Sequence, residues 1–279
     1  MQSFEQKNEL VTIRTMMETL GLKYMVKQIN TLEETGDYFE MNTSEILSSL
    51  LKEEVTGKKN TNAEMKRSRA HLFFPSADIS KIIYKPKREL NKSMIEFLST
   101  NSYISHNRSI MINAATGGGK TYMSCVFGNC ACDDGYSVRY FNMSDLLLTY
   151  QNKKRANADI KKLINYAANV DLLILDDFML TTVTREEAEF LYMIFSYRRP
   201  RDKKRSYIIC SQLMQEEIYD RLKDGAPSLA DAVMDRFSHG AYKINIKGDS
   251  MRADMVELDE MELQALAQSK ENGETIQTE

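Results

Sequence analysis

The segment AATGGGKT, which begins at Ala114, is the sequence feature that most constrains this chain. It lies between an apolar run with strand character and a run with helical character, which is the setting of a phosphate-binding loop. The pattern GxxxxGK[ST] is met at Gly119, Lys120 and Thr121, while its first glycine is replaced by Ala114. Two further glycines let backbone N–H groups turn inward around an anion. We predict a nucleotide-binding loop; the alternative is an ordinary glycine-rich turn.

Each position of such a loop has an expected role. Lys120 reaches the β- and γ-phosphates, and Thr121 supplies a hydroxyl group to Mg²⁺. The helix that follows points its positive end at the nucleotide. The predicted nucleotide-binding residues of the loop are Thr116, Gly117, Gly118, Gly119, Lys120, Thr121 and Tyr122.

A second motif, DLLILDD, begins at Asp171 and has the Walker B pattern. Its aliphatic residues predict a strand buried on both faces, so that Asp176 and Asp177 emerge at the edge where open α/β sheets bind ligands. We expect Asp176 to hold Mg²⁺ and Asp177 to orient the attacking water, where many related ATPases carry Glu. The shorter side chain leaves the hydrolytic rate open. The alternative is a buried strand followed by an acidic turn.

Alternating strand and helix patterns follow the N-terminal third of the chain. Such alternation predicts an α/β fold with a parallel sheet and crossover helices on both faces. The expected strands cover residues 109–115, 137–142, 207–212 and 241–247, and a further strand lies in the motif that begins at Asp171 and bears Asp176. The expected helices cover residues 120–134, 144–150, 159–169, 185–197, 214–222 and 229–238.

The first part of the chain shows helical periodicity instead, with apolar residues spaced by three and four positions between residues 9 and 59. A third helix is expected to begin near Ser44 and to continue through a polar stretch to Arg69. We therefore predict a helical N-terminal domain over residues 1–70, a linker and entry to the core over 71–100, a nucleotide-binding domain over 101–252, and an acidic tail over 253–279.

Composition narrows the class of protein. The net charge is −3, but basic residues dominate between residues 52 and 92 and acidic residues dominate the tail. No apolar run reaches the ~20 residues that a membrane helix needs, and no signal-peptide core is present, so we expect a cytoplasmic location and no membrane partner. The four cysteines lack paired CxxC spacing and are expected to be reduced core residues.

Two clusters of Lys and Arg can be interpreted as solvated faces or as contacts to the phosphates of DNA. Contacts of the second kind release counterions and depend weakly on sequence. The residues are Lys58, Lys59, Lys66, Arg67 and Arg69 in the first cluster, and Arg198, Arg199, Arg201, Lys203, Lys204 and Arg205 in the second. We find no base-reading motif, so backbone contact and DNA deformability are the expected means of binding.

The motifs together resemble the IstB family of AAA+ ATPases, helper proteins encoded beside a transposase in bacterial insertion sequences. The resemblance covers most of the chain and is carried by residues 20–25, 113–120, 135–141, 171–178, 211–212, 229–236 and 247–252. It implies a five-stranded AAA+ core, ATP at a subunit boundary, and a helical N-terminal domain that helps to bind duplex DNA. It also favours the DNA interpretation of the two basic clusters.

The resemblance implies further site residues. Gln212, or its neighbour Ser211, takes the sensor position that contacts the γ-phosphate or the water. Arg236 resembles the arginine finger that a neighbouring subunit inserts, a group that contributes several powers of ten to turnover. Without the resemblance, Arg236 reads as an ordinary ion-pair residue. Arg252 resembles a second nucleotide sensor.

The predicted function is that of an ATPase that binds ATP and Mg²⁺, forms a homo-oligomer on duplex DNA, remodels the DNA and stimulates a cognate transposase. Two alternatives remain open. One is a helicase loader of the DnaC kind, which shares the nucleotide core. The other is a nucleotide-dependent scaffold with weak catalysis.

Overall fold

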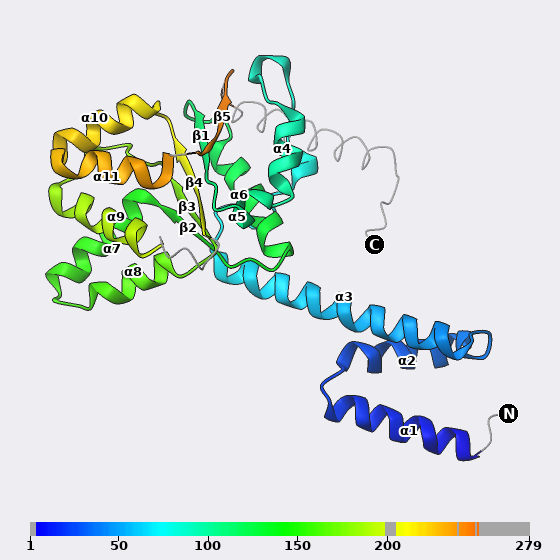
Figure 1. Ribbon diagram of the computed structural model, residues 1–279. Helices are drawn as coiled ribbons and strands as arrows, with labels where there is room; N and C mark the ends of the chain where they lie inside the picture. Colours follow the sequence, from blue (N-terminus) through cyan, green and yellow to red (C-terminus); the bar gives the residue numbers. More distant parts are fainter. Residues whose placement is uncertain (1–3, 199–204, 239, 249, 251–279) are drawn as a thin grey trace, which may run out of the picture. The chain divides into compact units, whose positions relative to one another are not determined.

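The computed structural model describes residues 4–198, 205–238, 240–248 and 250 (Figure 1). The chain divides into two compact units, Met1–Lys66 and Arg67–Glu279. The first unit is helical, and the second contains the sheet. The predicted acidic tail over 253–279 lies outside the described residues.

The first unit is built from α1 (Phe4–Thr19), α2 (Lys23–Thr35), the short 3₁₀ helix η1 (Asp37–Phe39) and most of α3 (Thr43–Ala70). Its small core is formed by Met25, Ile29, Leu32 and Leu50. The first three of these are spaced by four and three positions, which places them on one side of α2. Helical periodicity in the sequence therefore located the packed face.

Two contacts fix α2 against α3. The buried carboxylate of Glu54 accepts hydrogen bonds from the backbone N–H groups of Tyr24 and Met25, both at 2.9 Å. It thereby satisfies donors that the first turn of a helix leaves without partners. A Cβ atom on Gly57 would overlap the Tyr24 ring, so only glycine allows this approach of the two helices.

The second unit contains a five-stranded, wholly parallel sheet in the order β2-β3-β4-β1-β5. The strands are β1 (Ile110–Ala114), β2 (Val138–Asn142), β3 (Leu172–Asp176), β4 (Ser206–Ser211) and β5 (Tyr242–Ile246). The helices that follow β1 are α6 (Lys120–Asp133), α7 (Met143–Arg155), α8 (Ile160–Ala168), α9 (Arg185–Tyr197), α10 (Gln215–Gly225) and α11 (Pro227–Ser238). The predicted α/β fold with a five-stranded parallel sheet is confirmed.

Helices cover both faces of this sheet (Figure 1). Leu173 and Leu175 of β3 belong to the core formed with α7 to α11, whereas Leu172 and Ile174 belong to the core on the other face. Successive strand residues point to opposite faces, so a run of aliphatic residues fills both cores at once. The apolar run before the carboxylates therefore produces a central strand.

Residues 71–100, which we expected to form a linker and the entry to the core, contribute to the second core. They contain η2 (Ile79–Lys81), η3 (Pro86–Arg88) and α4 (Lys92–Ser99), and α5 (Ser102–Ser105) follows. Leu72, Ile82, Ile95 and Leu98 are buried against the α6 side of the sheet. The segment before β1 is thus part of the second unit.

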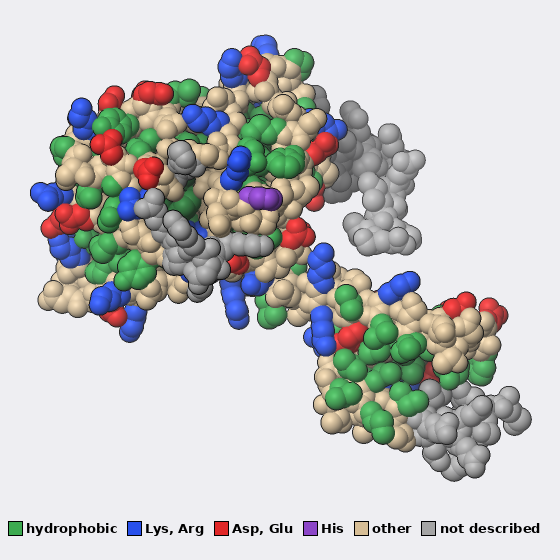
Figure 2. Space-filling view, viewed as in Figure 1, with side chains coloured by type: hydrophobic (Ala, Val, Ile, Leu, Met, Phe, Trp, Pro, Cys, Tyr) green, Lys and Arg blue, Asp and Glu red, His purple; other side chains and the backbone are tan. Residues whose placement is uncertain are grey.

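The surface of the first unit carries several exposed large apolar side chains, visible as a gathering of green on that unit in Figure 2. They include Val11, Met16, Leu20, Leu47 and Val55. Within the described residues, no helix has the length and apolar character required to cross a bilayer.

Candidate functional site

The predicted phosphate loop connects the end of β1 to the start of α6. Gly117 and Gly119 have positive φ angles of 76° and 92°. Residues with a Cβ adopt this region at an energetic cost, so the loop requires glycine at both places. At Gly117 a Cβ would also collide with the Ser250 side chain.

The missing first glycine of the motif has a local explanation. Ala114 is the last residue of β1, where any residue can adopt the extended backbone. A Cβ on Gly118 would lie 2.9 Å from the Cβ of Ala114. Glycine at 118 therefore provides the space that the alanine occupies, and the departure from the pattern leaves the loop intact.

The loop is joined to the first Walker B carboxylate. The Thr121 hydroxyl donates to Asp176 Oδ2 at 2.7 Å, and the Tyr140 hydroxyl donates to the same oxygen at 2.8 Å. Burial, together with the nearby Asp176 charge, raises the pKa of Tyr140, which therefore remains a donor at neutral pH. A hydroxyl and a carboxylate side by side are hard oxygen ligands of the kind that Mg²⁺ prefers.

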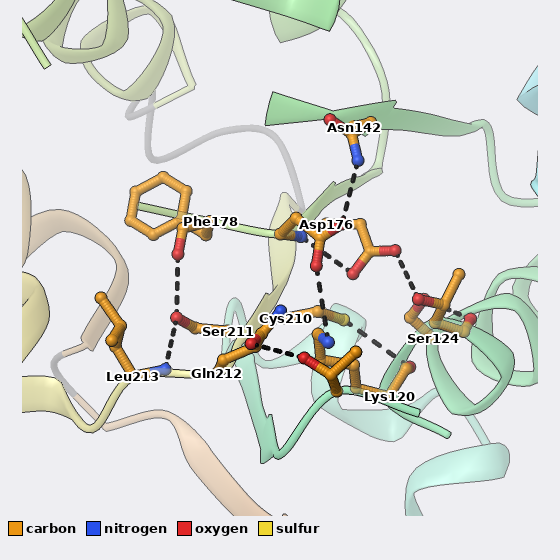
Figure 3. A network of polar contacts seen from close by, with 12 residues as sticks. Lys120, Ser124, Asn142, Asp176, Phe178, Cys210, Ser211, Gln212 and Leu213 are labelled. Atoms are coloured by element: carbon orange, nitrogen blue, oxygen red, sulfur yellow. Dashed lines mark hydrogen bonds and ion pairs between the residues drawn. The ribbon is translucent and has the colours of Figure 1, made fainter. Parts of the chain in front are cut away.

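The second carboxylate pairs with the lysine of the loop. Lys120 Nζ lies 3.4 Å from Asp177 Oδ1, and the Lys120 side chain is 7% exposed. Asn142 donates to Asp177 Oδ2 at 3.2 Å. Asp177 has a φ of 50°, a left-handed conformation that aspartate and asparagine adopt more readily than most residues with a Cβ. Figure 3 shows these contacts as one polar network.

The end of β4 supplies the predicted sensor residues. Ser211 is buried, and its hydroxyl donates to the Phe178 carbonyl at 2.8 Å and accepts from the Leu213 N–H at 3.1 Å. Gln212 instead faces the phosphate loop, where its Oε1 accepts a hydrogen bond from the Thr116 hydroxyl at 2.8 Å. Ser211 therefore fixes the strand end, and Gln212 is the residue of the pair that contacts the loop.

Sheet order explains why these residues meet. β4 lies between β1, which leads into the phosphate loop, and β3, which ends in the carboxylates. Only one strand therefore separates the loop from the carboxylates. Because the strands are parallel, their carboxyl ends share one edge of the sheet, the usual ligand site of open α/β folds. Asn142 is the register partner of Asp176 across β2 and β3, which brings it to the same edge.

Most of the chain matches one known protein family. The model of the IstB-like ATP binding protein family matches residues 15–268. The chain belongs to this family. A putative insertion sequence ATP-binding protein of Sinorhizobium fredii is 29% identical over 237 residues, covering 85% of this chain and 93% of that protein. The IS21 putative ATP-binding protein of Pseudomonas aeruginosa is 22% identical over 241 residues, covering 86% and 88%.

Solved structures share the fold of this IstB-like chain. A DNA replication initiation factor gives a TM-score of 0.55 at 22% identity, over 68% of this chain and 56% of that one. The DnaI structure gives 0.53 at 15% identity, over 62% and 92%. At these identities the likeness concerns the fold alone.

Other predicted residues of the IstB-like chain lie apart from the network. The Tyr122 hydroxyl bonds with the backbone of Asp78, and its ring centre lies 5.8 Å from that of Phe74. Arg236 on α11 packs against α9: its guanidinium lies 4.1 Å from the Tyr192 ring centre, and Nε donates to Ser196 Oγ at 3.2 Å. Arg252 lies outside the described residues.

The first basic cluster lies on α3. Lys58, Lys59 and Lys66 fall within about 100° of the helix circumference at 3.6 residues per turn, and we call them the α3 lysine stripe. Lys58 pairs with Glu54 at 3.0 Å. Arg67 and Arg69 are exposed in the second unit, where Arg67 pairs with Asp133.

The second basic cluster requires a correction at Arg198. This residue is buried, and its guanidinium donates to the carbonyls of Ala168, Val170, Asp171 and Ser206. These carbonyls lie at the end of α8, just before β3, and at the start of β4. The buried guanidinium has no access to a DNA phosphate, so its predicted DNA contact is wrong. Arg205 donates to Tyr197 and Asn169. Arg199, Arg201, Lys203 and Lys204 lie outside the described residues.

Sequence reasoning missed two residues of the site, Tyr140 and Asn142. Both belong to β2, and their side chains bond with the Walker B carboxylates. Asn142 could have been found as the last residue of a predicted strand in a parallel sheet, because such residues collect at the binding edge. Predicting the contact between Tyr140 and Asp176 requires the register between β2 and β3, and the sequence pattern does not give that register.

Proposed function

We propose that this chain is an ATP-dependent, DNA-binding regulator of transposition. On this proposal it assembles on duplex DNA when ATP is bound, remodels that DNA, and stimulates a partner transposase. The observation that carries the proposal is the direct joining of the phosphate loop to both carboxylates in a chain of the IstB-like family. Relatives are named as insertion sequence ATP-binding proteins, which supports a role beside a transposase.

The nucleotide-binding part of the proposal rests on the phosphate loop and the helix that follows it. Backbone N–H groups of the glycine loop would surround the β-phosphate, and the N-terminus of α6 would add its positive end. Thr121 and Asp176 would hold Mg²⁺, which neutralises charge that develops on the phosphates. A neighbouring fold, DnaA of Aquifex aeolicus, was solved with the ATP analogue AMPPCP bound, which supports this site for a triphosphate.

Hydrolysis requires the Lys120–Asp177 pair to separate. Lys120 moves to the phosphates, and Asp177 is then free to orient a water molecule for attack on the γ-phosphate. Gln212 is hydrogen-bonded to the loop residue Thr116 and follows the end of β4. A contact between Gln212 and the γ-phosphate would therefore couple the nucleotide to that strand. Arg236 of an adjacent protomer would stabilise charge in the transition state.

DNA binding is proposed for the α3 lysine stripe together with Arg67 and Arg69. Lysines on one side of a long helix can follow a phosphate backbone, and neutralising each phosphate releases counterions. Affinity should therefore fall steeply with salt and depend weakly on base sequence.

The test measures assembly by analytical ultracentrifugation with a duplex oligonucleotide. We expect large complexes with a slowly hydrolysed ATP analogue and none with ADP. Lys120→Ala should abolish them, whereas Lys161→Ala, an exposed lysine on α8, should behave as wild type. Equal DNA binding by wild type with the analogue, with ADP and without nucleotide would refute the switching scheme.

A second experiment separates the alternatives. Co-purification with a transposase supports the proposal, and co-purification with a replicative helicase supports a loader. The scaffold alternative predicts that DNA does not stimulate ATP turnover and that Asp177→Ala changes nothing.

A further inference from the structure

Arg88 contacts the phosphate loop from a segment that no motif connects with nucleotide binding. It is the last residue of η3, and its side chain is buried. One guanidinium nitrogen donates to the Gly118 carbonyl at 2.9 Å, and the other donates to the Ile83 carbonyl at 2.7 Å. The side chain therefore ties the segment before β1 to the middle of the loop.

The bonded carbonyl is important for the shape of the loop. When successive N–H groups of a loop converge on an anion, the carbonyls between them must point outward. An outward carbonyl that is buried needs a donor, and a charged donor gives roughly twice the strength of a neutral one. Arg88 supplies that donor to Gly118. A Cβ on Gly119 would lie 2.9 Å from the same guanidinium nitrogen, so glycine at 119 also admits the Arg88 side chain.

The backbone that carries Arg88 is itself anchored. Its carbonyl accepts a hydrogen bond from the Lys247 N–H at 3.2 Å, and Lys247 Nζ lies 2.9 Å from Glu89 Oε2. A Cβ on Gly248, which has a φ of 91°, would lie 3.2 Å from the Lys87 carbonyl oxygen. The segment is therefore packed closely against the chain that leaves β5, and Arg88 reaches the loop from a fixed base.

We propose that Arg88 is a positioning residue for the phosphate loop. It holds the Gly118 carbonyl outward, so that the loop N–H groups stay directed at the β-phosphate before a nucleotide arrives. This inference rests on the proposed nucleotide binding and adds a residue to it. Because Arg88 acts on the part of the loop that surrounds the β-phosphate, it should affect nucleotides with two or three phosphates and leave AMP unaffected.

The test measures the affinities of the full chain for ATP, ADP and AMP by competition against a fluorescent ADP analogue. In Arg88→Ala we expect ATP and ADP to bind about tenfold more weakly, the effect of losing one hydrogen bond to a charged group. AMP affinity should not change. Arg88→Lys should recover part of the loss, because an ammonium group can reach one carbonyl but cannot span two. Arg185→Ala, an exposed arginine on α9, is the matched control.

The positioning role and the proposed function are refuted by different results. Equal losses for ATP and AMP, or an unchanged ratio of the two affinities in both Arg88 variants, would refute the positioning role. If Arg88→Ala does not fold, the ratio in Arg88→Lys is the deciding measurement, and thermal unfolding without nucleotide monitors its stability. A wild type that fails to bind ATP, or a Lys120→Ala variant that binds as well as wild type, would instead refute the proposed function.

Discussion

Replacing Asp177 by asparagine should make the chain bind ATP more tightly and hydrolyse it more slowly. In the structure, Asp177 holds the lysine that a triphosphate needs. The substitution removes the negative charge and changes little else, because asparagine tolerates the φ of 50°. Its amide oxygen can still accept the hydrogen bond from Asn142.

The size of the effect follows from the geometry of the ion pair. At 3.4 Å and an effective dielectric constant of about 20, two unit charges attract by roughly 5 kcal/mol. The Asp177 side chain is 30% exposed, so solvent screening and desolvation reduce the net value to about 1–2 kcal/mol. Releasing Lys120 should therefore strengthen ATP binding about 5- to 30-fold. Loss of the carboxylate that orients water should slow turnover by at least about a hundredfold.

The assay is a titration with a fluorescent ATP analogue, followed by steady-state ATP turnover with duplex DNA present. Glu186→Gln, which breaks the exposed pair with Lys154, is the matched control and should change neither quantity. Weaker ATP binding by Asp177→Asn would show that the carboxylate does not compete for Lys120. Unchanged turnover would remove Asp177 from the hydrolytic step.

Three further predictions concern other contacts. Tyr140→Phe removes a donor to Asp176 and should raise the Mg²⁺ concentration for half-maximal turnover about tenfold, with ADP binding in the absence of Mg²⁺ unchanged. The pKa of Glu54 is lowered because, although burial opposes the charge, the N–H groups of Met25 and Tyr24 and the Lys58 ammonium favour it. Hydrogen-exchange protection of α2 should therefore decline as pH falls below about 4.3 toward the lowered pKa, a dependence that Glu54→Gln should flatten. Replacing the α3 lysine stripe with glutamine should reduce the salt slope of duplex binding by about 2.7, at about 0.9 per phosphate contact.

Much of the fold could be predicted because its signals are local. The run from Leu172 to Leu175 is aliphatic throughout, which is typical of a central parallel strand. The glycines and Lys120 of the phosphate loop occupy consecutive positions, so their chemistry is visible without a structure. The carboxyl ends of parallel strands share an edge, and therefore two separate motifs could be placed in one site.

Long-range contacts explain what the sequence could not show. Arg88 lies in a segment rich in lysine that resembles a solvated linker, and its partner Gly118 is far along the chain. Arg198 is one member of a basic run, and nothing in that run distinguishes a buried arginine from exposed ones. In both cases, burial of the side chain follows from packing between elements, which composition does not record.

The contacts of Arg236 suggest how nucleotide could control assembly on the proposed mechanism. Its guanidinium lies over the Tyr192 ring and donates to the Ser196 hydroxyl, both on α9 of the same chain. A cation–π contact at a partly exposed position contributes about 0.5–1 kcal/mol, and a hydrogen bond from a charged guanidinium contributes about 1.5–3 kcal/mol. A phosphate offers a charge-assisted and bidentate partner, which is stronger than either. A bidentate phosphate contact can therefore replace the contacts on α9 once a neighbouring protomer presents a triphosphate, and occupancy of that neighbouring site should promote assembly.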